Sequence, residues 1–502
     1  GDPMLQAWEV AWDAHALRSH PRKLWDANIF FPLGRSLAFS DALVGYSPAG
    51  LIGNGVHAAI VRYNVLLIFS FAFAAFGAYA LARVLGASIV GAAVAAAAFG
   101  FSPWRLAQIG HLNILSSGGI PLSVALLIHG FRRSSPGIIL AGWVIAAWQV
   151  TLGFSLGLQL LYLLVVLGIC FVVTWARRGR PRQPRGVALA TVAGGLILVA
   201  TTLVFARPYQ HVFGHFPEVQ RKIGEVAFFS PSSAGFASAP STDLVWGAIT
   251  AHPRRLENWP EEQTLFPGLI VLVLAGFCLL KGREAFSPRL VRGLALGVLV
   301  TGILALGLGP GVDAPYRVVY EIAPGWSGVR TPGRLITLTT LGLALLAAGG
   351  VTALRHRFSA RVWPAVGIAL VVAVLAEGFG RPPLLAPPTH PAVPVAAPVL
   401  FLPSDDVVDP LYTLWSIDGF PDVVNGSSGF RPMVTMALRD MASTFPDRAS
   451  ATALKELGVR TVVLDRRLAA PGTVWYELTR HPTAGALKPE FRGPWVVYRL
   501  NG

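Results

Sequence analysis

The chain has 502 residues, of which 53% are hydrophobic and only 13% are charged. Soluble globular domains carry roughly 25% charged residues, so this composition excludes an ordinary water-soluble protein. A net charge of +15 favours a nucleic-acid partner in a soluble protein. Here the basic residues gather beside apolar segments, which indicates orientation in a lipid bilayer and no nucleic-acid partner.

Residues 3–18 have the periodicity of an amphipathic helix. One stripe consists of Leu5, Trp8, Trp12 and Ala16, and Glu9 and Asp13 are turned away from it. Because tryptophan favours the headgroup region, we expect this helix to lie on the outer membrane surface. The chain begins at Gly1 without a methionine, and with residues 1–61 outside the membrane we expect one further membrane helix before Gly1.

Apolar segments occupy most of residues 62–380. A transmembrane helix needs about 20 apolar residues, and ten segments approach or reach that length. They are 62–82, 88–104, 113–131, 136–153, 155–176, 186–206, 266–280, 293–309, 335–354 and 362–379. The sequence therefore predicts an all-α polytopic membrane domain of about ten helices.

Alternate connections between these segments are rich in basic residues. Five short connections hold fifteen basic residues and one acid, Glu284. The basic residues are Arg83, Arg132, Arg133, Arg177, Arg178, Arg180, Arg182, Arg185, Lys281, Arg283, Arg289, Arg292, Arg355, Arg357 and Arg361. Basic loops stay in the cytoplasm, so residues 1–61, 207–265, 310–334 and 380–502 are expected outside.

The last part of the chain has a different composition. Residues 381–398 are rich in proline, with seven prolines between 382 and 398, and should form an extended linker. Residues 399–502 have ordinary charge and short alternating patterns. A helix at 451–457, a strand at 459–464 and a strand at 494–500 are expected, which predicts a small α/β domain outside the membrane.

Several short motifs follow one another along most of the chain. The first outer segment carries Gly1-Asp2-Pro3, Gln6, Trp8, Trp12, Asp26-Ala27-Asn28-Ile29-Phe30-Phe31-Pro32 and Ser40-Asp41. The later motifs are Glu262…Phe266-Pro267-Gly268, Val329-Arg330-Thr331-Pro332-Gly333-Arg334 and Trp415…Asn425-Gly426. In this order they resemble the GT-C membrane glycosyltransferases, and in particular the bacterial branch that glycosylates lipoteichoic acid and cell-envelope glycans.

The resemblance implies transfer of a sugar from a polyprenyl-phosphate donor, with an acidic residue after the first membrane helix as base. Asp2 matches that position, and Asp41 or Glu262 matches a second, assisting acid. A carboxylate can remove the proton of an acceptor hydroxyl, whereas the phosphate leaving group needs none. The alternatives remain that Asp2 only caps a helix and that Glu262 only favours a helix N-terminus. Asp41 could equally be a solvated loop acid.

Five arginines stand at helix ends on the outer side, where basic residues are normally depleted. They are Arg62, Arg105, Arg207, Arg330 and Arg334. Arginine is well shaped to hold phosphate oxygens, and Arg330 and Arg334 lie in a turn shaped by glycine and proline. His111 lies at the same level and is a further candidate for the donor phosphate. The alternative is contact with ordinary lipid headgroups.

Three functions remain open from the sequence. The first is an inverting glycosyltransferase that modifies an envelope glycan, lipid or protein. The second is a transporter or flippase of lipid-linked glycans, which usually has ionisable residues at mid-bilayer, where this chain has few. The third is a non-catalytic envelope-assembly protein. No cofactor is certain, but some GT-C relatives use a divalent cation, and Asp2, Asp41 and Glu262 are the candidates to hold one.

Overall fold

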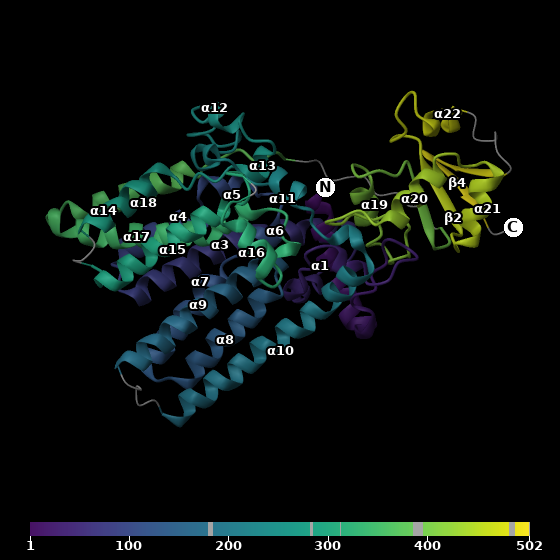
Figure 1. The fold of residues 1–502 in the computed structure, drawn as a ribbon. Coiled ribbons are helices and arrows are strands. Elements are labelled where there is room, and N and C mark those ends of the chain that lie inside the picture. The colour runs from purple at the N-terminus through teal and green to yellow at the C-terminus, as the bar shows by residue number, and fades with distance from the viewer. Residues whose placement is uncertain (179–183, 282–284, 312, 385–394, 481–486, 501–502) are drawn as a thin grey trace. The chain divides into compact units, whose positions relative to one another are not determined.

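The computed structural model describes residues 1–178, 184–281, 285–311, 313–384, 395–480 and 487–500. It is mostly helical, with one small sheet near the C-terminus (Figure 1). The chain divides into two compact units: unit 1 comprises 1–65, 206–219 and 385–502, and unit 2 comprises 66–205 and 220–384. Residues 385–394 of the expected linker, and Arg180, Arg182, Arg283 and Glu284, lie outside the described residues.

Each apolar segment expected from the sequence is helical, which confirms the polytopic membrane class. The ten helices are α3 (Gly55–Leu85), α4 (Ile89–Gly100), α7 (Gly119–Arg133), α8 (Pro136–Val150), α9 (Phe154–Arg178), α10 (Arg185–His215), α14 (Leu269–Lys281), α15 (Pro288–Ala305), α17 (Ile336–Leu354) and α18 (Trp363–Glu377). Within the described ranges, seven helical segments are long and apolar enough to cross a membrane, and α8, α14 and α18 are shorter apolar helices.

Short helices interrupt the connections of unit 2. They are α5 (Pro103–Ala107), α6 (Leu112–Leu115), α11 (Ile223–Phe228), α12 (Ala251–Arg254), α13 (Pro260–Gln263) and α16 (Tyr316–Ile322). The segments expected as outer loops, 207–265 and 310–334, therefore contain local structure.

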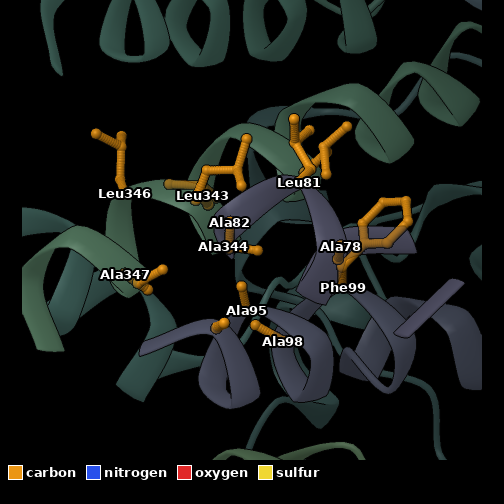
Figure 2. Close-up of a cluster of buried hydrophobic side chains, with 14 of the residues drawn as sticks. Ala78, Leu81, Ala82, Ala95, Ala98, Phe99, Leu343, Ala344, Leu346 and Ala347 are labelled. Atoms are coloured by element: carbon orange, nitrogen blue, oxygen red, sulfur yellow. The ribbon is translucent and has the colours of Figure 1, made fainter. Parts of the chain in front are cut away.

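Helix α17 lies at the centre of unit 2, packed against α4, α14 and α15. The shared core is built largely from alanine and leucine, including Ala95 and Ala98 of α4 and Ala344 and Ala347 of α17 (Figure 2). A Cβ added at Gly91 would lie 2.6 Å from the carbonyl oxygen of Ala348. Small residues allow helix backbones to approach closely in a membrane. This close packing stabilises the contact, because the hydrophobic effect does not drive helices together in lipid.

Other helices present large apolar side chains outward. On α10, Leu189, Val192, Leu196 and Leu203 are each more than 60% exposed. Such a surface is unfavourable in water but matches the hydrocarbon of a bilayer. The exposed apolar side chains therefore agree with the membrane assignment.

Unit 1 contains a four-stranded sheet with the order β1-β2-β4-β3. The strands are β1 (Val399–Leu402), β2 (Thr461–Asp465), β3 (Pro489–Arg492) and β4 (Trp495–Arg499). β1 and β2 are parallel, and β4 is antiparallel to both β2 and β3. The helices α19 (Asp409–Trp415), α20 (Met433–Ala442), α21 (Arg448–Glu456) and α22 (Val474–Arg480) complete the domain, which confirms the small α/β domain expected from the sequence.

The first segment of the chain pairs with this domain. The amide of Phe31 donates to the carbonyl of Val423, and the amide of Val423 donates to the carbonyl of Asn28. The amide of Phe30 donates to the carbonyl of Asn425. Whereas the sequence placed 1–61 and 399–502 in separate domains, both ranges fall in unit 1, since these backbone groups satisfy one another.

Candidate functional site

Helix α1 (Asp2–Ser19) carries a stripe of polar residues toward the interior of unit 1. Asp2, Gln6, Glu9 and Asp13 recur at intervals of four, three and four residues, which places them on one face of a helix. Gln6, Glu9 and Asp13 are 5%, 1% and 0% exposed, whereas Asp2 in the first turn is exposed. The helix thus leads from an accessible acid into a buried acidic row.

The expectation that Trp8 and Trp12 of α1 face the lipid headgroups is wrong. Trp8 and Trp12 are buried, and both indole N–H groups have protein acceptors. Trp8 Nε1 donates to Asn28 Oδ1 at 3.1 Å, and Trp12 Nε1 donates to the carbonyl of Leu24 at 2.8 Å. The tryptophans bind the following loop, so both faces of α1 are covered by protein.

The buried acids of α1 have unusual protonation properties. Burial, followed by the neighbouring charges of Asp13, Asp41 and Asp2, raises the pKa of Glu9 well above its ordinary value. Burial likewise raises the pKa of Asp13. Neither oxygen of Asp13 has a hydrogen-bond partner within the described part of the chain. The neutral form of each acid is therefore favoured, because an ionised, unpaired carboxylate is costly to bury.

Asp41 lies in a turn fixed by a tyrosine. Tyr209 Oη accepts the amide hydrogen of Ala42 at 2.9 Å and donates to the carbonyl of Ser40 at 3.0 Å. Electrostatic interaction connects Glu9 with both Asp41 and Asp2. Unit 1 therefore brings together two acids expected from the sequence, Asp2 and Asp41, and adds Glu9.

A second cluster, in unit 2, is centred on Glu262. Arg334 holds this carboxylate through two hydrogen bonds, Nη2 to Oε1 at 2.6 Å and Nε to Oε2 at 3.2 Å. His111 Nε2 lies 3.9 Å from Oε1. Burial opposes ionisation of Glu262, but the charges of Arg334, His111 and Arg330 more than offset it, so its pKa is lowered. A carboxylate held in this way is a weak proton acceptor and fixes the guanidinium of Arg334.

The segments that form this pair approach closely. A Cβ at Gly333 would lie 3.2 Å from the carbonyl oxygen of Glu262. The carbonyl of Arg334 accepts a hydrogen bond from Gln159 Nε2 at 3.2 Å. The close approach of the Glu262 backbone therefore favours glycine at position 333. Gln159 of α9 also holds the backbone of Arg334 in place.

Arg330 lies near this pair with a different environment. Its guanidinium stacks over the ring of Phe229, with 4.9 Å between Cζ and the ring centroid. Burial, together with the charges of Arg334 and Arg221, lowers its pKa. In the described ranges Arg330 forms no ion pair with a carboxylate. This half-buried cation has capacity for an anionic ligand.

Two other predicted phosphate ligands are placed elsewhere. Arg105 is 0% exposed, donates to Ser117 Oγ and to the carbonyl of Leu115, and is surrounded by aromatic rings. Nη1 and Nη2 serve the protein interior, and Nε is buried without an acceptor in the described part of the chain. Because the whole side chain is enclosed, the prediction of Arg105 as a phosphate ligand has no support in its surroundings. Arg207 is exposed on α10 in unit 1.

The cation expected from some GT-C relatives also lacks a prepared ligand set. Among the described residues, no group of three or more histidines, cysteines or acids is placed to hold a metal ion. Sequence reasoning missed Glu9 as a site residue and ranked Asp13 below Asp2, Asp41 and Glu262. The spacing of Asp2, Gln6, Glu9 and Asp13 was the available signal, but it was assigned to the solvent side of the helix.

Comparison with known proteins gives evidence on the fold. No family model matches the chain, and no curated protein matches it. The arabinofuranosyltransferase AftD from Mycobacteria matches 98% of this chain with 16% identity and a TM-score of 0.56, and the chain covers 38% of AftD. The oligosaccharyltransferase of Archaeoglobus fulgidus matches 92% with 13% identity and a TM-score of 0.50.

The chain spans 66% of the oligosaccharyltransferase, so it is shorter than both matched structures. At these identities the likeness concerns the course of the backbone. Both similar structures are glycosyltransferases by name, and the matches cover 98% and 92% of this chain. The chain is thus a multi-pass membrane protein with the GT-C glycosyltransferase fold.

Proposed function

We propose that this protein transfers a sugar from a polyprenyl-phosphate donor to a glycan, lipid or protein of the bacterial cell envelope. The likeness to AftD and to the oligosaccharyltransferase supports a glycosyltransferase by its fold. The observation that carries the proposal is the pair Arg330 and Arg334. One guanidinium is held by Glu262 and the other has no carboxylate partner in the described part of the chain.

The arginine pair is suited to a phosphate group. In our proposal Arg330 binds the phosphate oxygens of the donor and offsets the charge that grows on them as the bond from the sugar to phosphate breaks. Arg334 supports this role from a fixed position, because Glu262 holds two of its donors. Glu262 and His111 are then positioning residues.

The acceptor needs a base, and we assign this role to Asp2. The acceptor hydroxyl loses its proton to the Asp2 carboxylate as its oxygen attacks the anomeric carbon, and the polyprenyl phosphate departs as an anion. Attack from the side opposite the leaving group inverts the anomeric configuration. Asp41 assists through its charge. Burial favours the neutral forms of Glu9 and Asp13, so these two acids add little negative charge beside Asp2 and Asp41.

The remaining assignments follow from charge and composition. We propose that the Arg-rich connections face the cytoplasm and that residues 1–61 and 399–502 lie outside. Nucleotide sugars are not available there, which favours a lipid-linked donor. The α/β domain contributes to holding the acceptor.

The test uses purified protein in lipid nanodiscs with a panel of polyprenyl-phosphate sugars and with glycans, lipids and proteins of the bacterial envelope as acceptors, and it measures release of polyprenyl phosphate. We expect Asp2→Asn to lower the rate at least 100-fold, since general-base catalysis contributes about 10²–10⁴. Arg330→Ala should lower kcat/KM by a similar factor, and Arg330→Lys should restore part of it.

Two residues outside the proposed site serve as matched controls. Asp440→Asn removes an exposed carboxylate in unit 1, and Arg317→Gln removes a half-buried arginine in unit 2 that pairs with Glu321. Both variants should keep full activity. Full activity of Asp2→Asn in a preparation that the unmodified chain shows to be active would reject Asp2 as base. Absence of turnover with every donor would reject the transferase itself.

A further inference from the structure

A second pocket lies in unit 1, at the end of α1 remote from Asp2. Its volume is about 390 Å³. His15 and Arg18 of α1 line it, about 20 Å along the helix from Asp2 at the usual rise per residue. The pocket is therefore separate from the acid proposed as base. Arg62, one of the outer-side arginines expected from the sequence to suit a phosphate, lines it, and the proposed function gives this pocket no role.

One wall of the pocket is a glycine-rich loop that leads into α3. Gly53, Asn54 and Gly55 line the pocket. Gly53 and Gly55 have φ values of +74° and +76°, which favour glycine. Helix α3 begins at Gly55 and has 31 residues. The first amides of a long helix lack partners in the helix and carry partial positive charge, so this end favours an anion.

Arg62, about two turns further along α3, gives independent evidence for a ligand. The residue is 8% exposed and lines the pocket. Its Nη1 donates to the carbonyls of Ile52 and Gly53 at 2.6 and 2.8 Å, which fixes the guanidinium against the loop. Its Nε is buried and has no acceptor within the described part of the chain. A buried, charged donor without an acceptor is costly unless a ligand supplies one.

The charged residues that line the pocket give it a net positive charge. Arg18 and Arg62 contribute two positive charges, and Asp418 contributes one negative charge. Asp418 Oδ1 lies 3.0 Å from where a Cβ of Gly55 would stand, so its carboxylate is next to the start of α3. Phe420, with a φ of +47°, stacks on His15 at 4.2 Å between ring centroids and closes the pocket on this side.

We propose that this pocket binds a phosphate group, either a lipid phosphate headgroup or a free phosphate. The guanidinium groups of Arg18 and Arg62 and the amides at the start of α3 supply donors for phosphate oxygens. The pocket opens beside apolar surface: Leu51 and Ile52 are 57% and 72% exposed, and α3 is a candidate membrane span. This surface suits the acyl chains of a lipid whose phosphate occupies the pocket.

The experiment measures binding of dioctanoyl phosphatidic acid and of inorganic phosphate to the purified full chain in detergent, by native mass spectrometry and by the shift in Tm. Arg62→Gln and Arg18→Gln should each weaken binding about tenfold, the loss expected for a hydrogen bond to a charged group. Arg18 is exposed, so its variant tests the site even if Arg62→Gln does not fold. Arg22→Gln removes a nearby exposed arginine that does not line the pocket and should change nothing.

Asp418→Asn separates an anionic ligand from a neutral one. It removes a negative charge beside the ligand and should tighten phosphate binding by roughly fivefold. In a pocket built for a neutral, hydroxyl-rich ligand such as a sugar, the Asp418 carboxylate would be a needed hydrogen-bond acceptor, and its loss would weaken binding. Weaker binding of both phosphate probes to Asp418→Asn would therefore overturn the proposal. Unchanged binding in both Arg18→Gln and Arg62→Gln would overturn it as well. Saturation by inorganic phosphate identifies a free phosphate as the ligand, and binding of phosphatidic acid alone identifies a lipid.

Discussion

Glu9 and Asp13 of α1 are buried, although the periodicity of the sequence placed them on the solvent side of the helix. Their carboxyl groups are turned into the interior of unit 1, where Asp13 has no hydrogen-bond partner in the described ranges. A protein that retains two such acids gives up stability at neutral pH, because burial favours the protonated form. Glu9 and Asp13 lie on the same face of α1 as Asp2, so this loss of stability falls beside the residue proposed as the base.

The first prediction concerns the pH dependence of stability. In the unfolded chain Glu9 and Asp13 ionise near pH 4, whereas in the folded chain burial raises the pKa of both. As pH rises above about 4, the unfolded state loses their protons first, so their contribution to the free energy of unfolding declines. The Glu9→Gln, Asp13→Asn double variant lacks this loss. It should melt at a higher temperature than the unmodified chain at pH 8.

The comparison at low pH is the control. At about pH 3, below the unfolded pKa values, both acids are largely protonated in either state, so the double variant and the unmodified chain should have similar Tm values. A thermal melt by intrinsic fluorescence in detergent, at intervals between about pH 3 and pH 8, measures the difference. A constant difference across this range would contradict buried, neutral acids.

At the scale of helices, close contact in unit 2 depends on residues without side-chain bulk. A Cβ added at Gly350 of α17 would collide with the carbonyl oxygen of Leu274 of α14. A Cβ at Gly195 of α10 would meet no atom within 4 Å. The same residue type therefore has different roles in a central and in a peripheral helix.

This contrast predicts opposite effects of the same substitution. Gly350→Ala should lower the free energy of unfolding by about 1–3 kcal/mol, because α14 and α17 must separate. Gly195→Ala should leave it unchanged or raise it by up to about 1 kcal/mol, since alanine is the better helix former. Unfolding in increasing SDS measures both. Equal effects would show that α14 and α17 do not depend on this contact.

At the scale of the whole molecule, distant parts of the sequence form one compact unit. Residues 1–65 and 385–502 both belong to unit 1, joined by hydrogen bonds such as that from Asn28 Nδ2 to the carbonyl of Pro421 at 2.8 Å. Asn425, 1% exposed, binds both backbone groups of Phe401 and also the carboxylate of Asp409. The motif around Asn425 therefore has a structural role in the described part of the chain.

The third prediction tests the orientation that the basic connections imply. In a background with Cys170→Ala and Cys278→Ala, which removes both cysteines, Arg22→Cys should react with a membrane-impermeant maleimide in intact cells. Arg133→Cys should react only after the membrane is opened. Both positions are exposed in the structure, so access and not burial decides the result. The reverse pattern of labelling would place the first segment and the proposed base in the cytoplasm.

The sequence by itself determined the membrane class, the ten apolar helices and the small C-terminal α/β domain, because these follow from composition and from local periodicity. It also indicated the turn of Arg330 and Arg334. Only the tertiary structure decided which side chains are paired or buried: Glu262 is held by Arg334, Arg105 is enclosed, and Trp8 and Trp12 bind the protein and not the lipid surface. An apolar or charged face looks the same in sequence whether lipid, water or another segment covers it, and that choice depends on contacts between residues far apart in the chain.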